Sequence, residues 1–345
     1  MKLLIITQKV DKDDPVLGFF HRWLEEFANH VEQLTVICLK QGDTDLPNKV
    51  KILSLGKESG RSRFKYLWRF YIYLWQERKN YEAVFVHMNQ IYILLAGLIW
   101  RLSDKKIGLW YVHRQVSPSL RLAEKLTNII FTTSAEVFKL SSRKTVYTGH
   151  GIDTEFFKPT EDKFTDNKIH LVSVGRLSPV KEFEILIEAS KVLVSEGYPL
   201  AVDIIGGSID DQSYENRLKQ MIVDYKLEEI INLRGPLNQS QMREYLKSNA
   251  VFVHTCRIGS WDKVTLEAMS RGLPVISPSE VIRPITEPVG MYFSGDSRDL
   301  AQKIKNIIDG NVDTSTIGRK FRQYVILNNS LANLITKIMS CYKRE

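Results

Sequence analysis

The chain has few cysteines, no long hydrophobic run, and neither internal repeats nor low-complexity tracts. Its three cysteines, Cys38, Cys256 and Cys341, are widely separated and form neither an even disulfide set nor a zinc-like cluster. The longest apolar stretch, Ile91–Trp100, is about half of what a membrane span needs. The apolar run Leu3–Ile6 is followed too soon by polar residues for a secretory signal. These absences favour a protein of the reducing cytoplasm without a transmembrane helix.

The composition allows two globular domains. With 345 residues and 43% hydrophobic content, the chain can form two separate buried cores. Apolar runs typical of strands alternate with helical patterns, which predicts parallel sheets covered by helices on both faces. In the first half the expected strands are Lys2–Thr7, Leu34–Leu39, Val50–Leu53, Ala83–His87, Ile107–Val112 and Ile129–Thr132, and the expected helices are Leu17–His30, Arg63–Lys79 and Ile91–Leu102.

The same alternation restarts in the second half. The expected strands there are Ile169–Val174, Ala201–Ile205, Ile230–Leu233, Val251–His254, Pro274–Ser277 and Met291–Phe293. The fold class is therefore α/β, with two doubly wound, Rossmann-like units joined near residues 148–160. Such sheets bind ligands at the carboxyl ends of their strands, and a cleft between two units would let both contribute.

Two segments carry charged groups where an expected strand meets an expected helix. In Gly175–Lys181, Ser178 is a candidate N-cap and Pro179 suits the first helical position. Free amides and the positive end of that helix would favour an anion beside Arg176 and Lys181. In the second segment, Lys263–Met269, Glu267 lies a turn inside a short and mostly apolar helix. Two cations, helix-end amides and a carboxylate together suit a nucleotide diphosphate with a ribose.

These segments resemble the signature of the family-4 glycosyltransferases, retaining enzymes of the GT-B fold. The matching residues are Arg176, Lys181, Glu267, Ala268, Met269, Gly272, Pro274 and Val275. Gly151–Pro159 resembles the segment that opens the family's C-terminal domain, and the resemblance covers nearly the whole chain. It implies an acceptor domain (1–150), a nucleotide-sugar domain (151–320) and a last helix (321–345) that crosses back to the first domain. One position departs from the pattern, because Gly259 stands where the family has a Glu.

The resemblance assigns roles to the donor-binding residues. Arg176 and Lys181 would hold the diphosphate, and Glu267 would bind the ribose hydroxyls. We also place Asp262, Lys263 and Val264, at the start of the same helix, in the donor site. The alternative for Glu267 is a structural ion pair with a Lys or Arg. We expect Asp262 to cap its helix and also to contact the sugar, in place of the Glu missing at position 259.

Other candidates lie in the first half. His113 follows an expected strand, and retaining relatives carry a His there, near the donor sugar; an ordinary surface or core role is the alternative. His87 and Asn89 follow the preceding strand and could contact the acceptor. Gly18 lies between the first strand and helix, where relatives bring backbone close to a ligand, although a plain turn explains it equally well.

No metal or cofactor is expected. The acidic triplets Asp11–Asp13 and Asp43–Asp45 lie in polar loops, and solvated acid is their better interpretation. If Arg176 and Lys181 neutralise the leaving diphosphate, a metal ion is not required.

The net charge of +8 is concentrated in an aromatic segment, residues 61–79. Basic residues with aromatic rings favour the headgroup layer of an anionic membrane, whereas no motif for nucleic-acid recognition accompanies them. Some of these rings must instead pack on the sheet.

The sequence predicts a retaining glycosyltransferase that moves a sugar from a UDP- or GDP-linked donor to a hydroxyl of a glycan or lipid-linked acceptor. It would act in the cytoplasm, with possible attachment to the inner face of the membrane. Two alternatives remain: a nucleotide-sugar epimerase or sugar phosphorylase on the same fold, and a non-catalytic module that binds nucleotide sugar or membrane.

Overall fold

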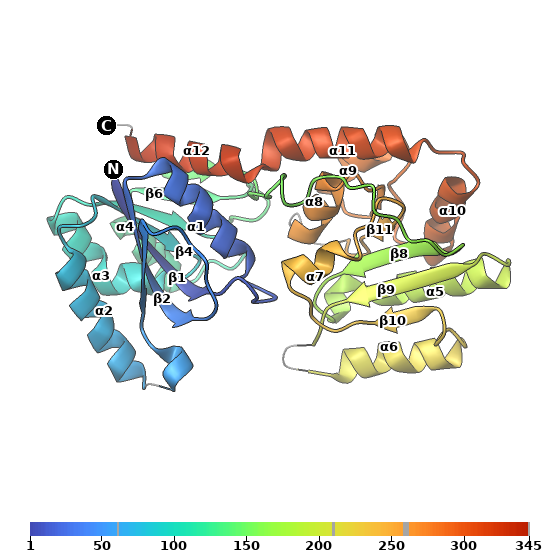
Figure 1. Ribbon diagram of the computed structural model, residues 1–345, viewed down its shortest axis with the longest axis horizontal. Coiled ribbons are helices and arrows are strands. Elements are labelled where there is room, and N and C mark those ends of the chain that lie inside the picture. The colour runs from blue at the N-terminus through green and yellow to red at the C-terminus, as the bar shows by residue number, and fades with distance from the viewer. Residues whose placement is uncertain (61, 209–210, 258–261, 344–345) are drawn as a thin grey trace. The chain divides into compact units, whose positions relative to one another are not determined.

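The computed structural model describes residues 1–60, 62–208, 211–257 and 262–343. The chain divides into two compact units (Figure 1). Unit 1 consists of Met1–Gly151 together with Ser330–Glu345, and unit 2 consists of Ile152–Asn329. Each unit contains one parallel sheet, so the predicted fold class of two Rossmann-like α/β domains is confirmed.

The sheet of unit 1 has seven strands in the order β3-β2-β1-β4-β5-β6-β7. The strands are β1 (Lys2–Val10), β2 (Gln33–Gln41), β3 (Val50–Ser54), β4 (Ala83–His87), β5 (Lys106–Trp110), β6 (Ile129–Thr132) and β7 (Thr145–Tyr147). Every pairing is parallel. The sequence analysis did not predict β7, a three-residue edge strand.

Helices cover both faces of this sheet because alternate residues of each strand point to opposite sides. Leu3 and Ile5 of β1 belong to one core, whereas Leu4 and Ile6 belong to the other. The first core is closed by α1 (Phe19–His30) and α12 (Leu331–Lys343), and the second by α2 (Arg63–Glu77), α3 (Ile91–Leu102) and α4 (Pro118–Leu126). A 3₁₀ turn, η1 (Lys57–Ser59), precedes α2. In the described part of the chain, no helix is both long and apolar enough to cross a membrane.

The helix expected to return to the first domain is two helices. Residues 314–329 form α11 (Thr314–Asn329), whose Phe321 and Val325 are buried in the core of unit 2. Helix α11 ends at Asn329, and α12, which starts at Leu331, packs in unit 1 with Leu334 and Ile338 buried. The returning segment therefore begins at 330 and not at 321, because the apolar positions on the two sides of Ser330 face different cores.

The sheet of unit 2 has five parallel strands in the order β10-β9-β8-β11-β12. They are β8 (Ile169–Val174), β9 (Leu200–Ile205), β10 (Ile231–Leu233), β11 (Val251–Val253) and β12 (Val275–Ile276). Besides α11, the helices are α5 (Phe183–Ser195), α6 (Ser213–Asp224), α7 (Gln239–Arg243), α8 (Lys263–Ser270), α9 (Arg283–Thr286) and α10 (Ser297–Ile308), with 3₁₀ turns η2 (Pro179–Lys181) and η3 (Glu287–Val289). The expected strand 291–293 is only a bridge between Ser277 and Tyr292.

The strand order reverses direction once in each sheet, between β1 and β4 in unit 1 and between β8 and β11 in unit 2. In doubly wound sheets, loops that leave adjacent strands at such a switch point run to opposite faces and open a crevice between them. The residues that follow β8 and β11 are therefore the first place to search for a ligand site in unit 2.

Candidate functional site

Lys181 lies at the end of η2, the short turn that follows β8. Its side chain folds back over Gly175, where an added Cβ would lie 3.3 Å from the Lys181 Cε atom. Its backbone carbonyl accepts a hydrogen bond of 2.5 Å from the Thr255 hydroxyl, which follows β11. The backbone of Lys181 is thus held between the two loops that follow β8 and β11, the strands of the unit 2 switch point.

The helix expected directly after Ser178 does not start there. Pro179–Lys181 forms one 3₁₀ turn, the Ser178 side chain makes no capping bond, and α5 begins at Phe183. The reason is Glu182, whose φ of 50° is left-handed and interrupts the helical backbone. The guanidinium of Arg257 holds Glu182 in place with two hydrogen bonds, of 3.1 and 2.7 Å, to its carboxylate.

The ammonium of Lys181 forms an ion pair with the carboxylate of Asp262. The same carboxylate oxygen lies 2.9 Å from Nε2 of His254, and His254 Nδ1 lies 2.9 Å from the Ser277 hydroxyl. The network is satisfied if Ser277 donates to Nδ1 and Nε2–H donates to Asp262. A chain of four polar side chains therefore runs from the turn after β8 to the end of β12.

Asp262 occupies the N-cap position of α8, but its side chain makes no capping hydrogen bond. The expectation of a side-chain cap is therefore wrong, because the carboxylate turns toward Lys181 and His254 instead. Burial opposes ionisation of Asp262, yet the hydrogen bonds from His254 and Lys181 and the charge of Lys181 outweigh it and hold its pKa well below the ordinary value. Asp262 is a carboxylate that neutralises Lys181.

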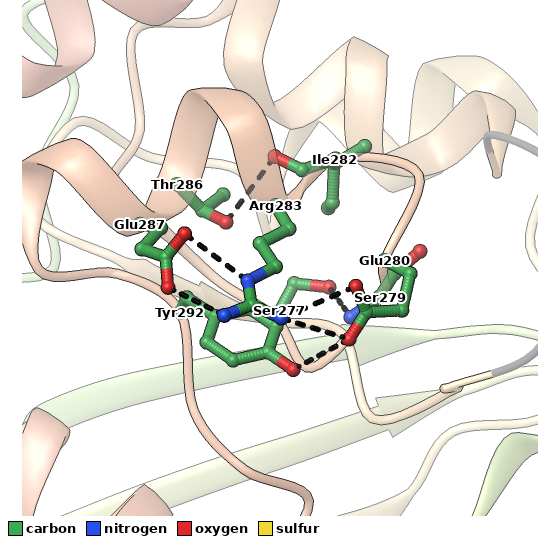
Figure 2. A network of polar contacts seen from close by, with 8 residues as sticks. All are labelled: Ser277, Ser279, Glu280, Ile282, Arg283, Thr286, Glu287 and Tyr292. Carbon is green, nitrogen blue, oxygen red and sulfur yellow. Dashed lines mark hydrogen bonds and ion pairs between the residues drawn. The ribbon is translucent and has the colours of Figure 1, made fainter.

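Figure 2 shows how the loop after β12 anchors Ser277. The Ser277 hydroxyl accepts a hydrogen bond of 3.1 Å from the backbone amide of Ser279. Farther along, Arg283 donates two hydrogen bonds to Glu287, 2.8 and 3.1 Å long, and its guanidinium lies 4.7 Å from the Tyr292 ring centre. These contacts all lie within the segment from β12 to Tyr292. The Ser277 end of the network is therefore held by residues close to it in sequence.

Glu267 lies on the buried side of α8, with only 3% of its surface exposed. The Gln239 amide donates a 2.8 Å hydrogen bond to one carboxylate oxygen, and the Lys263 ammonium lies 3.9 Å from that oxygen. A long ion pair between Glu267 and Lys263 is thus present, as the alternative of a structural ion pair predicts. Val264, on the first turn of the same helix, is half-buried and packs against the core of unit 2.

Arg176 follows β8 and is exposed. Its guanidinium makes no hydrogen bond or ion pair with any other residue that the structure describes. A cation without a described partner, five residues before a Lys181 that already has one, leaves room for an anionic ligand after β8. Gly259, where the family pattern has a Glu, lies outside the described residues.

In unit 1, Gly18 serves the packing of its own loop. It is buried, and an added Cβ would lie 2.5 Å from the Asp14 carbonyl oxygen and 2.9 Å from that of Lys12. The Gly18 amide donates to the Asp14 carbonyl at 2.9 Å. The close approach that requires a glycine is therefore made by the protein backbone, which favours the plain turn among the two interpretations.

His87 is the last residue of β4 and is only 2% exposed. Its ring stacks on Phe20 with 4.0 Å between ring centres, and Nδ1 lies 3.1 Å from the Thr7 hydroxyl. Asn89 accepts a hydrogen bond of 3.3 Å from the Ile91 amide at the start of α3. Both side chains thus have local structural tasks, and contact with an acceptor would require the rings around His87 to move.

His113 lies three residues after β5, since that strand ends at Trp110 and not at Val112. Its ring is exposed and packs edge-on against Tyr111, with 5.6 Å between ring centres. His113 is therefore a side chain that a ligand could reach without rearrangement.

The acidic triplets are paired with lysines. Lys9 binds Asp11 at 2.8 Å and also Asp14, and Lys12 lies 3.3 Å from both Asp43 and Asp45. Asp45 also comes close to His21 and Glu25, and these three side chains are near enough to share a cation. Each nitrogen of the His21 ring already faces one of the two carboxylates, at 3.0 Å for Asp45 and 3.5 Å for Glu25.

The sequence analysis missed His254 and Ser277. Both follow a strand directly, and this is the same signal by which His87 was chosen. The link from Lys181 to Asp262 joins residues 81 positions apart, and no local pattern could have revealed it.

Residues 154–324 match the family described as glycosyl transferases group 1. Among curated proteins, the amylovoran biosynthesis glycosyltransferase AmsK of Erwinia amylovora is 29% identical over 174 residues, which cover 47% of this chain and 42% of AmsK. AmsD of the same organism is 24% identical over 277 residues, covering 74% of this chain and 76% of AmsD. The chain spans about half the length of most curated relatives that it matches.

Among solved structures, HepE from Anabaena in complex with UDP has a TM-score of 0.73 and 18% identity. The similarity covers 99% of each chain. At this identity the likeness establishes the fold of the whole chain, two Rossmann-like domains of the GT-B type, and nothing more specific.

Proposed function

Because residues 154–324 match the glycosyl transferases group 1 family, we propose that the protein is a retaining, metal-independent glycosyltransferase. It transfers a hexose from a nucleotide diphosphate donor to a hydroxyl of a growing glycan or lipid-linked acceptor, in the cytoplasm. The names of AmsK and AmsD, which refer to amylovoran biosynthesis, support a glycan acceptor, and the UDP and UDP-glucose in the HepE structures support a UDP-linked donor.

The observation that carries this proposal is the position of Lys181 at the switch point of the unit 2 sheet. Its ammonium is paired with Asp262 at the start of α8, and a second cation, Arg176, with no partner among the described residues, follows the same strand as Lys181. Glu267 lies one turn into α8. A diphosphate on the two cations and a ribose on Glu267 fit the order in which these groups occur in a nucleotide sugar.

The reaction breaks the bond between the anomeric carbon and the diphosphate oxygen while the acceptor oxygen bonds to that carbon. Negative charge develops on the leaving diphosphate, and fixed cations stabilise it most in the transition state. Arg176 and Lys181 supply this charge without a metal ion. The acceptor proton passes to the leaving phosphate, and attack on the face from which it departs keeps the anomeric configuration. His113 is the unit 1 residue proposed to contact the sugar.

Asp262 adds a feature that the family resemblance does not contain. Its carboxylate occupies Lys181, so a bound diphosphate must compete with it for the ammonium. The proposed role of Asp262 is to hold Lys181 in position when the donor is absent.

The test is incubation of the purified full chain with UDP- and GDP-linked sugars and a mixture of glycan acceptors, followed by NMR of the product. Transfer with retained anomeric configuration supports the proposal, whereas an inverted product contradicts the mechanism. An epimerised sugar formed from donor alone would show an epimerase, and a sugar phosphate formed with inorganic phosphate would show a phosphorylase. Binding of nucleotide sugar without any turnover would indicate that the protein is a non-catalytic binding module.

A further inference from the structure

Helix α2 carries two apolar stripes, and only one of them is used by the core. Phe70 and Leu74 point into unit 1 and are buried. Phe64, Trp68 and Trp75 point outward and are 86%, 71% and 68% exposed. Their spacing of four and seven residues puts them on one side of the helix. A helix that needs only one stripe to pack on its sheet therefore presents a second one to the solvent.

Helix α3 extends this outward surface. The two helices lie side by side (Figure 1), joined by a 3.0 Å hydrogen bond from the Tyr71 hydroxyl to the Leu95 carbonyl. The rings of Phe70 and Tyr92 also pack between them, with centres 5.2 Å apart. On α3, Leu98 and Leu102 are exposed, the latter by 82%. We call this surface the outer face, and it consists of Phe64, Trp68, Tyr71, Trp75, Leu98 and Leu102.

Scattered exposed apolar residues are ordinary, but a continuous patch on neighbouring helices marks a binding surface. Phe64, Trp68 and Tyr71 together with Leu67 and Lys65 also line a shallow depression on α2. Covering these large rings with an apolar layer would be favourable, because it removes their apolar surface from water.

The exposed charges of α2 and α3 beside the outer face are positive. Arg63 and Lys65 are exposed beside Phe64, and Arg78 stacks on Trp75 with 4.0 Å between its guanidinium carbon and the ring centre. The sequences of α2 and α3 contain a single acidic residue, Glu77, which is buried and bonded to Lys51 at 2.6 Å. The partner of this face must therefore be apolar where it meets the rings and anionic around them.

We propose that the outer face docks on the surface of an anionic lipid bilayer, with Phe64, Trp68 and Trp75 among the headgroups. Aromatic rings and short apolar stripes suit the boundary between headgroups and acyl chains, and exposed cations beside them attract anionic lipid. A second copy of the chain is a poor occupant, because it would place cations against cations. The outer face shares no residue with the site proposed for sugar transfer, so the two proposals stand or fall separately.

The experiment is flotation of the full chain with vesicles, either rich in phosphatidylglycerol or made of phosphatidylcholine alone. The wild-type protein should float with the anionic vesicles, float less at high salt, and stay in solution with the neutral ones. The double variant Phe64→Ser/Trp68→Ser should reduce the bound fraction at least roughly tenfold, because two rings lose their apolar contact. Its matched control is Val223→Ser/Leu327→Ser, which removes two apolar side chains exposed on unit 2 and should float as the wild type does.

A charge pair completes the design. Arg63→Ser/Lys65→Ser should weaken flotation, whereas Lys168→Ser/Lys320→Ser, which removes the same net charge from exposed positions of unit 2, should not. Failure of the wild type to float at low salt overturns the proposal, as does equal loss in the control variants. If the aromatic variant changed the oligomeric state and the wild type bound no lipid, the face would be a contact between copies of the chain.

Discussion

The carboxylate of Asp262 forms an ion pair with the ammonium of Lys181, 81 positions earlier in the chain. Both side chains are mostly shielded from water, being 25% and 17% exposed. The pair changes what is expected of both residues. Lys181 is less free to attract a phosphate than its position suggests, and the carboxylate of Asp262 already has two protein partners, Lys181 and His254.

Asp262→Asn should raise the affinity for free UDP or GDP by several-fold to about tenfold, because the diphosphate no longer competes with a charged carboxylate for Lys181. Isothermal titration calorimetry measures this directly. Asp309→Asn, which removes an acid from the surface of the same unit, should leave the affinity unchanged. Weaker nucleotide binding by the Asp262→Asn variant would mean that Asp262 helps the ligand and does not compete with it.

The same residue should make stability depend on acid pH. The pKa of Asp262 is lowered in the folded protein, so its ionised form contributes stability above the ordinary pKa of 3.8. That contribution decreases as the pH falls below this value and Asp262 becomes protonated. The difference in unfolding free energy between wild type and Asp262→Asn should therefore be largest near neutral pH and shrink below about pH 4. Urea denaturation of both proteins across this pH range tests the prediction. A difference in unfolding free energy that grows toward acid pH would contradict it.

Glu267→Ala should weaken binding of the intact nucleotide at least roughly tenfold, since the ribose hydroxyls lose a charged acceptor worth about 1.5–3 kcal/mol. The variant also leaves the Gln239 side-chain amide without the carboxylate to which it now donates a hydrogen bond. Its melting temperature must therefore be measured beside its affinity. Glu267→Gln keeps the shape of the side chain and serves as the control for packing. Unchanged affinity in a folded Ala variant would remove Glu267 from the site.

Arg176→Ala and Lys181→Ala should lower kcat more than they weaken donor binding, because charge on the diphosphate develops as the bond breaks. Activity should persist in EDTA for the same reason. Arg298→Ala removes an exposed cation from the start of α10 and should leave both parameters intact. Dependence on Mg²⁺ or Mn²⁺ would show that the two cations are not sufficient.

Gly206→Ala should destabilise unit 2 by more than about 2 kcal/mol, because the added Cβ would lie 1.9 Å from the Gly175 carbonyl oxygen. The matched control is Gly197→Ala. Gly197 also has a positive φ, of 88°, but no described atom lies within 4 Å of an added Cβ, so only the backbone cost of roughly 1 kcal/mol applies. Equal losses in thermal unfolding would mean that the contact between the ends of β8 and β9 relaxes easily.

Sequence reasoning located most strands to within one or two residues. A buried parallel strand is a short apolar run, and the change from apolar to polar residues marks where it ends. Ile169–Val174 is an example in which expectation and structure coincide. The failures have physical causes. The start of α5 depends on the left-handed Glu182, which Arg257 holds from another loop, and the break at Ser330 depends on which core each side of a helix meets. Side-chain partners such as Lys181 and Asp262 follow from the folded topology, which local patterns do not encode.

The division of unit 1 between Met1–Gly151 and Ser330–Glu345 also affects the order in which the protein can fold during synthesis. Within unit 1, the Tyr342 hydroxyl donates a 2.8 Å hydrogen bond to the Val84 carbonyl, and it lies where any side chain at position 108 would have to be. The α1 side of that sheet stays only partly covered until α12 leaves the ribosome. Unit 2 is made in the interval, which lasts roughly ten to forty seconds at usual rates of translation. The unit that is synthesised first is therefore the one completed last.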